Sequence, residues 1–115
     1  FMQRDPQYLL DILTSAKLAM AYLAANTKED FLNDIQVQDS VVRRLEIIGE
    51  ASRRLSESTR TTLSQIPWRR MIGMRNIIIH EYDEVDLEVV WDTIQNYLPP
   101  LIEELEKIVP PENRT

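Results

Sequence analysis

The chain has 115 residues, of which 43% are hydrophobic and 28% charged, and its formal net charge is −6. This length and apolar content suffice for one domain with a single core. The negative charge argues against non-specific nucleic-acid binding by the whole surface. The sequence contains no cysteine and one histidine, which excludes a disulfide framework, a thiolate metal site and a histidine-rich metal site within one chain.

The sequence shows neither a membrane-spanning nor a targeting segment. No apolar run approaches the roughly 20 residues that span a bilayer, and no signal peptide is recognisable. Because Phe1 precedes Met2, we expect Met2 to be the native first residue. We predict a cytoplasmic protein without a membrane partner, formed by one domain over residues 1–115. Residues 1–4 and 110–115 are expected to be flexible.

The first predicted helix starts at Asp5 and ends near Asn26. Asp5 is the expected N-cap residue, and Pro6 suits the first helical position because that position needs no backbone N–H donor. Apolar residues recur at helical spacing over this range: Leu9, Ile12, Leu13, Ala16, Ala19, Met20 and Leu23. Thr27 and Asp30 then predict a capping box that opens a short helical turn.

A second long helix is predicted over residues 34–56. It carries two apolar stripes, which favours a central place in a bundle or packing against a partner chain. Gly49 in its middle should cost on the order of 1 kcal/mol relative to alanine, so we expect a compensating contact. Glu50 lies four residues from both Glu46 and Arg54, and the spacing to Arg54 predicts pairing on the helix surface.

A third helix is predicted to open at Pro67 and to end near His80, after a polar connection with one helical turn over residues 56–66. At about 100° per residue, four of its residues form one polar strip: Arg69, Gly73, Asn76 and His80. Gly73 leaves a notch in this strip where a ligand or a backbone can approach closely. Arg75 lies at the edge of the strip, so its stem can be buried while its guanidinium group reaches toward the strip.

The last helix has a clear predicted start at Asp86, which is the expected N-cap residue. Val85 and Val90 occupy the flanking positions of a hydrophobic staple, and an apolar seam continues to Ile108. The pair Pro99-Pro100 should kink or break this helix, because each proline removes one helical hydrogen bond. The four long helices and the lack of strand patterns predict an all-α, up-down four-helix bundle with short extra helices.

Basic residues concentrate in the middle of the chain. Residues 40–80 contain eight arginines against three glutamates, a balance of +5, so the rest of the chain must carry −11 to reach the total of −6. The planar guanidinium group matches the oxygen atoms of a phosphate. Helix-surface pairing is the slightly favoured interpretation for four of these arginines, whose roles stay open: Arg43, Arg44, Arg53 and Arg54. Arg69 and Arg75 fit a functional role better.

Arg75, Asn76, His80 and Tyr82 fall within eight residues, and their side chains suit a phosphate site. Guanidinium groups bind phosphate and stabilise charge in the transition state, and an imidazole transfers protons near neutral pH. Asn76 could orient a substrate or could simply hydrogen-bond between helices. One imidazole cannot serve at once as general base and general acid, so metal-free cleavage of a phosphodiester would need a second copy of the chain.

The charged and aromatic residues of this site also have structural interpretations. His80, in the last helical turn, could interact with the helix dipole as a cap. Arg75 could pair with Glu84 or Asp86 across the following turn. Tyr82 could be a core aromatic residue with its hydroxyl group at the surface. Only the combination of these residues brings the functional interpretation level with the structural one.

Three segments resemble the HepT-like branch of the HEPN superfamily: Ile66-Pro67-Trp68, Gly73-Met74-Arg75-Asn76 and His80-Glu81-Tyr82. The pattern R-x4-H-x-Y of that branch is met by Arg75, His80 and Tyr82. Residues 48–51 and 85–91 also resemble it, so the similarity covers most of the chain. The resemblance implies a HEPN-like all-α fold that forms a two-fold homodimer.

Members of this branch are toxins that act as metal-independent ribonucleases without a cofactor, beside an antitoxin that is a minimal nucleotidyltransferase. The resemblance implies that Arg75 and His80 from both protomers meet at the two-fold interface and cleave RNA, with transfer RNA as the expected substrate. Three further residues are expected to bind the substrate: Arg69, Arg70 and Asn76. The antitoxin would restrain the toxin by transferring AMP from ATP onto Tyr82.

Two other functions stay open at this point. A non-catalytic nucleotide-binding or adaptor dimer is supported by acidic residues that would be unfavourable beside an RNA cleft: Glu81, Asp83, Glu84, Asp86, Glu88 and Asp92. The fold itself gives no ground for assigning chemistry. A metal-dependent phosphohydrolase built from helical carboxylates is less well supported, because the sequence lacks Glu-x-x-His pairs.

Overall fold

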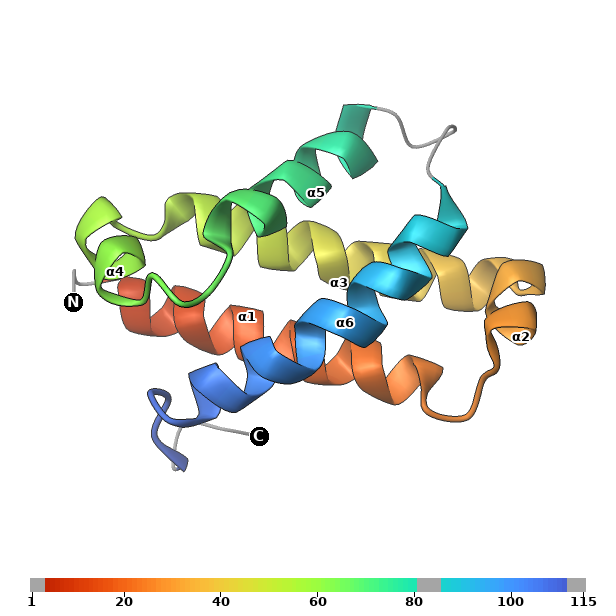
Figure 1. The fold of residues 1–115 in the computed structure, drawn as a ribbon, viewed down its shortest axis with the longest axis horizontal. Helices are drawn as coiled ribbons and strands as arrows, with labels where there is room; N and C mark the ends of the chain where they lie inside the picture. Colours follow the sequence, from red (N-terminus) through yellow and green to blue (C-terminus); the bar gives the residue numbers. More distant parts are fainter. Residues whose placement is uncertain (1–3, 81–85, 112–115) are drawn as a thin grey trace.

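Six helices make up most of residues 4–80 and 86–111, the part of the chain described by the computed structural model (Figure 1). They are α1 (Asp5–Leu23), α2 (Lys28–Asn33), α3 (Ile35–Arg54), α4 (Glu57–Thr62), α5 (Trp68–His80) and α6 (Leu87–Glu106). Within these residues there is no strand, and the four long helices alternate in direction. The predicted all-α, up-down four-helix bundle with short extra helices is confirmed. Tyr82 and Val85 lie outside the described residues.

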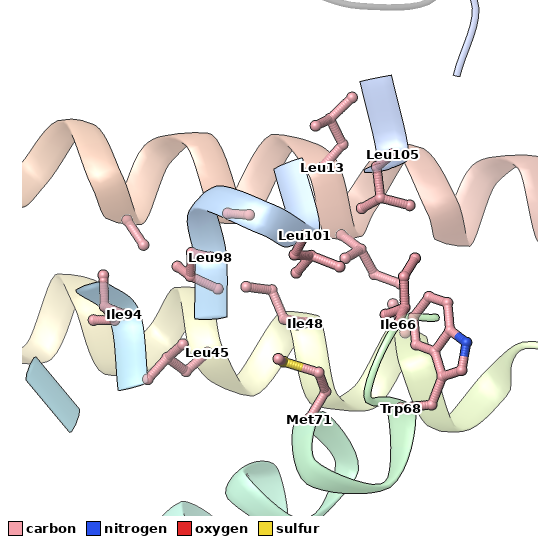
Figure 2. Packing of buried hydrophobic residues seen from close by; sticks show 14 of the residues in the cluster. Leu13, Leu45, Ile48, Ile66, Trp68, Met71, Ile94, Leu98, Leu101 and Leu105 are labelled. Carbon is pink, nitrogen blue, oxygen red and sulfur yellow. The ribbon is translucent and has the colours of Figure 1, made fainter. Parts of the chain in front are cut away.

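The hydrophobic core lies where α6 crosses the antiparallel pair of α1 and α3 (Figure 1). The largest fully buried side chains are Phe31, Leu9, Ile12, Leu13, Ile48, Ile94, Leu98, Leu101, Leu105, Val41 and Val90. Trp68 and Met71 bring the start of α5 into the same core, next to Ile66 and Ile48 (Figure 2). Among the described residues, none of the helices combines the length and the apolar character needed to cross a membrane.

Local capping signals position most helix starts as expected. Thr27 and Asp30 form the predicted capping box, with both side chain to backbone hydrogen bonds at 3.1 Å. The helix that it opens buries Phe31, whose ring centroid lies 5.7 Å from that of Trp91 on α6. Asp86 accepts a hydrogen bond from the backbone of Glu88 at 3.0 Å and caps α6 as predicted.

The predicted role of Asp5 as an N-cap residue is wrong. Arg4 occupies the cap position without a side-chain cap, and Asp5 is the first residue of α1. Its carboxylate is buried and accepts hydrogen bonds from the backbone N–H and the hydroxyl group of Ser56, at 3.1 and 2.6 Å, and from the hydroxyl group of Thr59. A buried charge needs hydrogen-bond donors, and the start of α4 supplies more of them than the first turn of α1.

Of the kink or break predicted at Pro99-Pro100, the break does not occur, because α6 continues from Leu87 to Glu106 with both prolines inside it. The two missing N–H donors deprive the carbonyl groups of Gln95 and Asn96 of their usual helical partners. Both of these residues are exposed, so water can satisfy their carbonyl groups. The opposite side of the helix is anchored in the core by the buried side chains of Leu98 and Leu101, on either side of the two prolines.

Candidate functional site

The site begins with the close approach of α3 and α5 at Gly49. A Cβ atom at this position would lie 2.0 Å from Cβ and 2.7 Å from Cγ of Arg75, and 3.0 Å from the carbonyl oxygen of Met71. Any side chain larger than hydrogen would therefore push α5 away from α3. This contact compensates for the low helix propensity of glycine, as expected from its place in the middle of the helix.

The Arg75 side chain extends from this contact to an ion pair on α3. Its Nη2 atom lies 3.0 Å from Oε2 of Glu50, and the side chain is 23% exposed. The side chain is thus largely buried, as predicted for its stem, and the Nε atom of the guanidinium group is buried as well. Glu50 is absent from the predicted partners of Arg75, because the two residues are 25 positions apart and no local periodicity connects them.

Glu50 holds three arginines at once. Besides Arg75, it accepts from Nη2 of Arg53 and from Nε of Arg54, each at 2.8 Å. The predicted pairing of Glu50 with Arg54 is confirmed. Hydrogen bonds from Arg53 and Arg54 lower the pKa of Glu50 from 4.5 to about 2, so the carboxylate stays ionised. Three guanidinium groups around one carboxylate leave a net charge of +2, and this cluster can attract an anion.

The cluster borders an open pocket of about 340 Å³ between α1, α3 and α5. Its lining residues are Tyr8, Asp11, Arg43, Glu46, Ile47, Glu50, Ala51, Arg54 and Arg75. Because Arg75 forms part of the wall, a ligand in the pocket can reach its guanidinium group. The lining also contains three carboxylates, which makes the pocket as a whole electrically mixed.

The remaining motif residues continue along α5 or follow it. Asn76 lies inside the helix and His80 is its last residue, but their side chains lie outside the description, as does Tyr82. The helix is unbroken from Trp68 to His80. The helical spacing that puts the four residues of the predicted polar strip on one face is therefore present in its backbone. Gly73 borders open space, since a Cβ atom there would meet nothing within 4 Å, as expected for a notch.

The two arginines at the start of α5 differ from each other and from Arg75. Arg69 is exposed, whereas the guanidinium carbon of Arg70 lies 4.7 Å from the ring centroid of Tyr97 on α6. A cation over an aromatic face is an attractive contact, so Arg70 helps to join α5 to α6. Arg69 and Arg70 line pockets other than the one beside Arg75. The structure therefore separates these predicted substrate-binding residues from Arg75.

Comparison with known proteins matches residues 12–108 to the family described as ribonuclease HepT-like. A probable ribonuclease HepT of Thermococcus cleftensis is 40% identical over 101 residues, covering 88% of this chain and 92% of that protein. A protein of Caldanaerobacter subterraneus subsp. tengcongensis named as an RNase is 34% identical over 111 residues, covering 96% and 99%.

A Methanocaldococcus jannaschii protein whose name joins a gamma-glutamylcyclotransferase to an RNase is 39% identical over 109 residues. The match covers 94% of this chain but 49% of that protein, so the chain spans about half of this relative's length. No solved structure matches the chain. The family match includes α3 and α5, and with them Glu50, Arg75 and His80. The chain belongs to the HepT-like ribonuclease family.

Proposed function

We propose that this protein is a metal-independent endoribonuclease whose active site is completed by two copies of the chain. The observation that carries the proposal is the Arg75 side chain, which lines an open pocket and is held there by Glu50 within a cluster of net charge +2. The protein belongs to a ribonuclease family, and its sequence contains one histidine. A two-fold homodimer would bring two imidazoles to one site.

In the proposed reaction, His80 of one protomer removes the proton from a ribose 2′-hydroxyl group, and the 2′-oxygen attacks the adjacent phosphorus. The bond from phosphorus to the 5′-oxygen breaks, and His80 of the other protomer protonates the leaving oxygen. The products are a 2′,3′-cyclic phosphate and a free 5′-hydroxyl group. Arg75 stabilises the additional charge on the phosphate oxygens, and Asn76 orients the substrate or the imidazole.

Regulation by a minimal nucleotidyltransferase antitoxin is part of the same proposal. The antitoxin would transfer AMP from ATP to the hydroxyl group of Tyr82, with release of pyrophosphate. Tyr82 follows His80 by two positions, so the modification would bring a negatively charged phosphate and an adenine close to the reacting groups. Charge repulsion and bulk would then exclude RNA. The protein would accordingly act as the toxin of a toxin–antitoxin pair in the cytoplasm, with transfer RNA as the expected target.

The test is cleavage of labelled RNA in excess EDTA by the wild type, His80→Ala and Arg75→Ala. We expect the wild type to stay active and both variants to lose at least about a hundredfold in rate, because each removes a group that acts on the transition state. Lys107→Ala serves as the control, since Lys107 is an exposed cation paired with Glu104 near the end of α6. Loss of wild-type activity in EDTA, or full activity of both variants, would refute the mechanism.

An adaptor without catalysis is the second candidate, and the acidic start of α6 favours it. Asp86, Glu88 and Asp92 are all exposed, so they could bind a basic partner surface. The two functions differ in their response to Tyr82→Phe. A restrained enzyme should become toxic to cells that still contain the antitoxin, provided that the variant remains active without it. An adaptor should leave growth unchanged.

A further inference from the structure

A second pocket lies between α4 and the first turns of α5, at the opposite end of α5 from His80. It measures about 410 Å³ and is lined by Glu57, Arg60, Thr61, Trp68, Arg69 and Ile72. Two guanidinium groups thus adjoin an aromatic and an aliphatic side chain. The two guanidinium groups suit a phosphate group, because their planar N–H donors match its oxygen atoms.

The arginines of this α4–α5 pocket are not accounted for by internal ion pairs. In the part of the chain that the structure describes, neither Arg60 nor Arg69 lies within ion-pair distance of a carboxylate. In the same part, Nε of Arg60 is buried without a hydrogen-bond acceptor. With Glu57 as the one carboxylate in the lining, the pocket has a balance of +1, which favours an anion.

The wall of the pocket is held in place before any ligand arrives. Trp68 is 6% exposed, and its indole Nε1–H donates a hydrogen bond to the carbonyl oxygen of Leu63 at 3.0 Å. The α4 side is fastened by the buried Asp5 carboxylate, which accepts from Ser56 and Thr59. A preformed site loses little conformational entropy on binding, so the two arginines need only adjust their ends.

We propose that the α4–α5 pocket binds an RNA backbone phosphate other than the one that is cleaved, with Arg60 and Arg69 as the binding residues. The inference rests on the proposed ribonuclease function and extends it. Arg69 and His80 are 11 residues apart in one unbroken helix, which places their backbones about 16 Å from each other along the axis. A single phosphate cannot contact both ends of α5, whereas an oligonucleotide can.

This separation makes substrate length the decisive variable. A dinucleoside monophosphate has one phosphodiester, which must occupy the catalytic site, so it leaves the α4–α5 pocket empty. We therefore compare its cleavage with that of a 12-nucleotide RNA for Arg60→Gln, Arg69→Gln and the double variant. Each single variant should lower kcat/KM for the longer RNA by about tenfold, the loss of one charge-assisted phosphate contact. The values for the dinucleotide should stay unchanged.

Lys107→Gln is the control, because it removes one positive charge from an exposed site at the end of α6. Thermal denaturation of all variants verifies that they fold. Equal losses on both substrates would show that the arginines act on folding or on the reacting phosphate, and would overturn the inference. An unchanged kcat/KM for the longer RNA would overturn it as well.

A binding measurement separates this inference from the proposed catalysis. A 12-nucleotide RNA with 2′-O-methyl groups cannot form the 2′,3′-cyclic phosphate, so its affinity can be followed without cleavage. For each single variant, the slope of log K against log salt should become shallower by about 0.7. If the wild type cleaves no RNA but each variant still shows this change in slope relative to the wild type, the catalytic proposal fails and the pocket stands. If the wild type does not bind, or the slopes are equal, the pocket assignment fails.

Discussion

Replacing Gly49 by alanine is expected to destabilise the protein and to displace Arg75. The new methyl group would start 2.0 Å from Cβ of Arg75 and 3.0 Å from the carbonyl oxygen of Met71. Ordinary contact begins at 3.4 Å, so α5 must move away from α3 by about 1.4 Å. Neither neighbouring atom belongs to a flexible side-chain end, so the whole helix has to shift.

Two terms determine the size of the effect on stability. Overpacking lowers the free energy of unfolding by about 1–3 kcal/mol, and the better helix propensity of alanine raises it by about 1 kcal/mol. We expect a net loss of up to about 2 kcal/mol, which corresponds to a fall in Tm of up to roughly 8 °C for a domain of this size. If the proposed reaction is correct, the same shift should lower the cleavage rate by on the order of a hundredfold, because Arg75 would no longer be aligned.

Gly73→Ala is the matched control for this prediction. Gly73 also lies inside a helix, but a Cβ atom there would meet nothing within 4 Å. This variant should therefore gain up to about 1 kcal/mol from helix propensity alone. The assay is thermal or urea denaturation of both variants beside the wild type. If Gly49→Ala is as stable as Gly73→Ala, the close approach does not limit the packing of α5, and the reasoning is refuted.

Three further predictions concern separate parts of the molecule. The folded-state pKa of Glu50 is about 2 against an ordinary 4.5, so its stabilisation is present above pH 4.5 and lost as the pH falls toward 2. The Tm of the wild type should fall more over this pH range than the Tm of Glu50→Gln. If the two plots of Tm against pH run parallel, the three arginines do not stabilise the ionised Glu50 carboxylate. If the proposed regulation is correct, coexpression with a minimal nucleotidyltransferase antitoxin should add about 329 Da per AMP group to the intact mass, and Tyr82→Phe should abolish the gain at that residue. Asp5→Ala should cost about 2 kcal/mol in urea denaturation, because it leaves Ser56 and Thr59 without their buried acceptor; an unchanged free energy of unfolding would show that water replaces the carboxylate.

Helix bounds and caps follow from short stretches of the chain. The capping box of Thr27 and Asp30, the cap at Asp86 and the start of α5 at Trp68 all occur where the sequence predicts them. Each of these signals depends on atoms within one helical turn, so it holds where no distant group competes for the capping side chain, as Ser56 and Thr59 do for Asp5. In the same way, the helical register assigned Arg69 to the polar strip of α5, and Arg69 is exposed in the structure.

The candidate site could be predicted in part. The spacing of Arg75, His80 and Tyr82 identified the motif, and the register of the helix placed the Arg75 stem at the edge of the core. Nothing in that spacing pointed to Glu50, although a glutamate within four residues of two arginines is a visible sign of a charge cluster. Such a sign cannot tell which other helix the cluster will face.

The partners of Gly49, Glu50 and Asp5 were decided by the tertiary structure. The Asp5 carboxylate accepts hydrogen bonds from Ser56 and Thr59, which are 51 and 54 positions away, and therefore does not cap its own helix. Contacts of this kind depend on how far each helix is rotated about its axis and where it crosses its neighbour. Those quantities are set jointly by every side chain in the core. The sequence by itself determined where helices form and which face of each is apolar, and the packing of those faces against one another determined which charges meet.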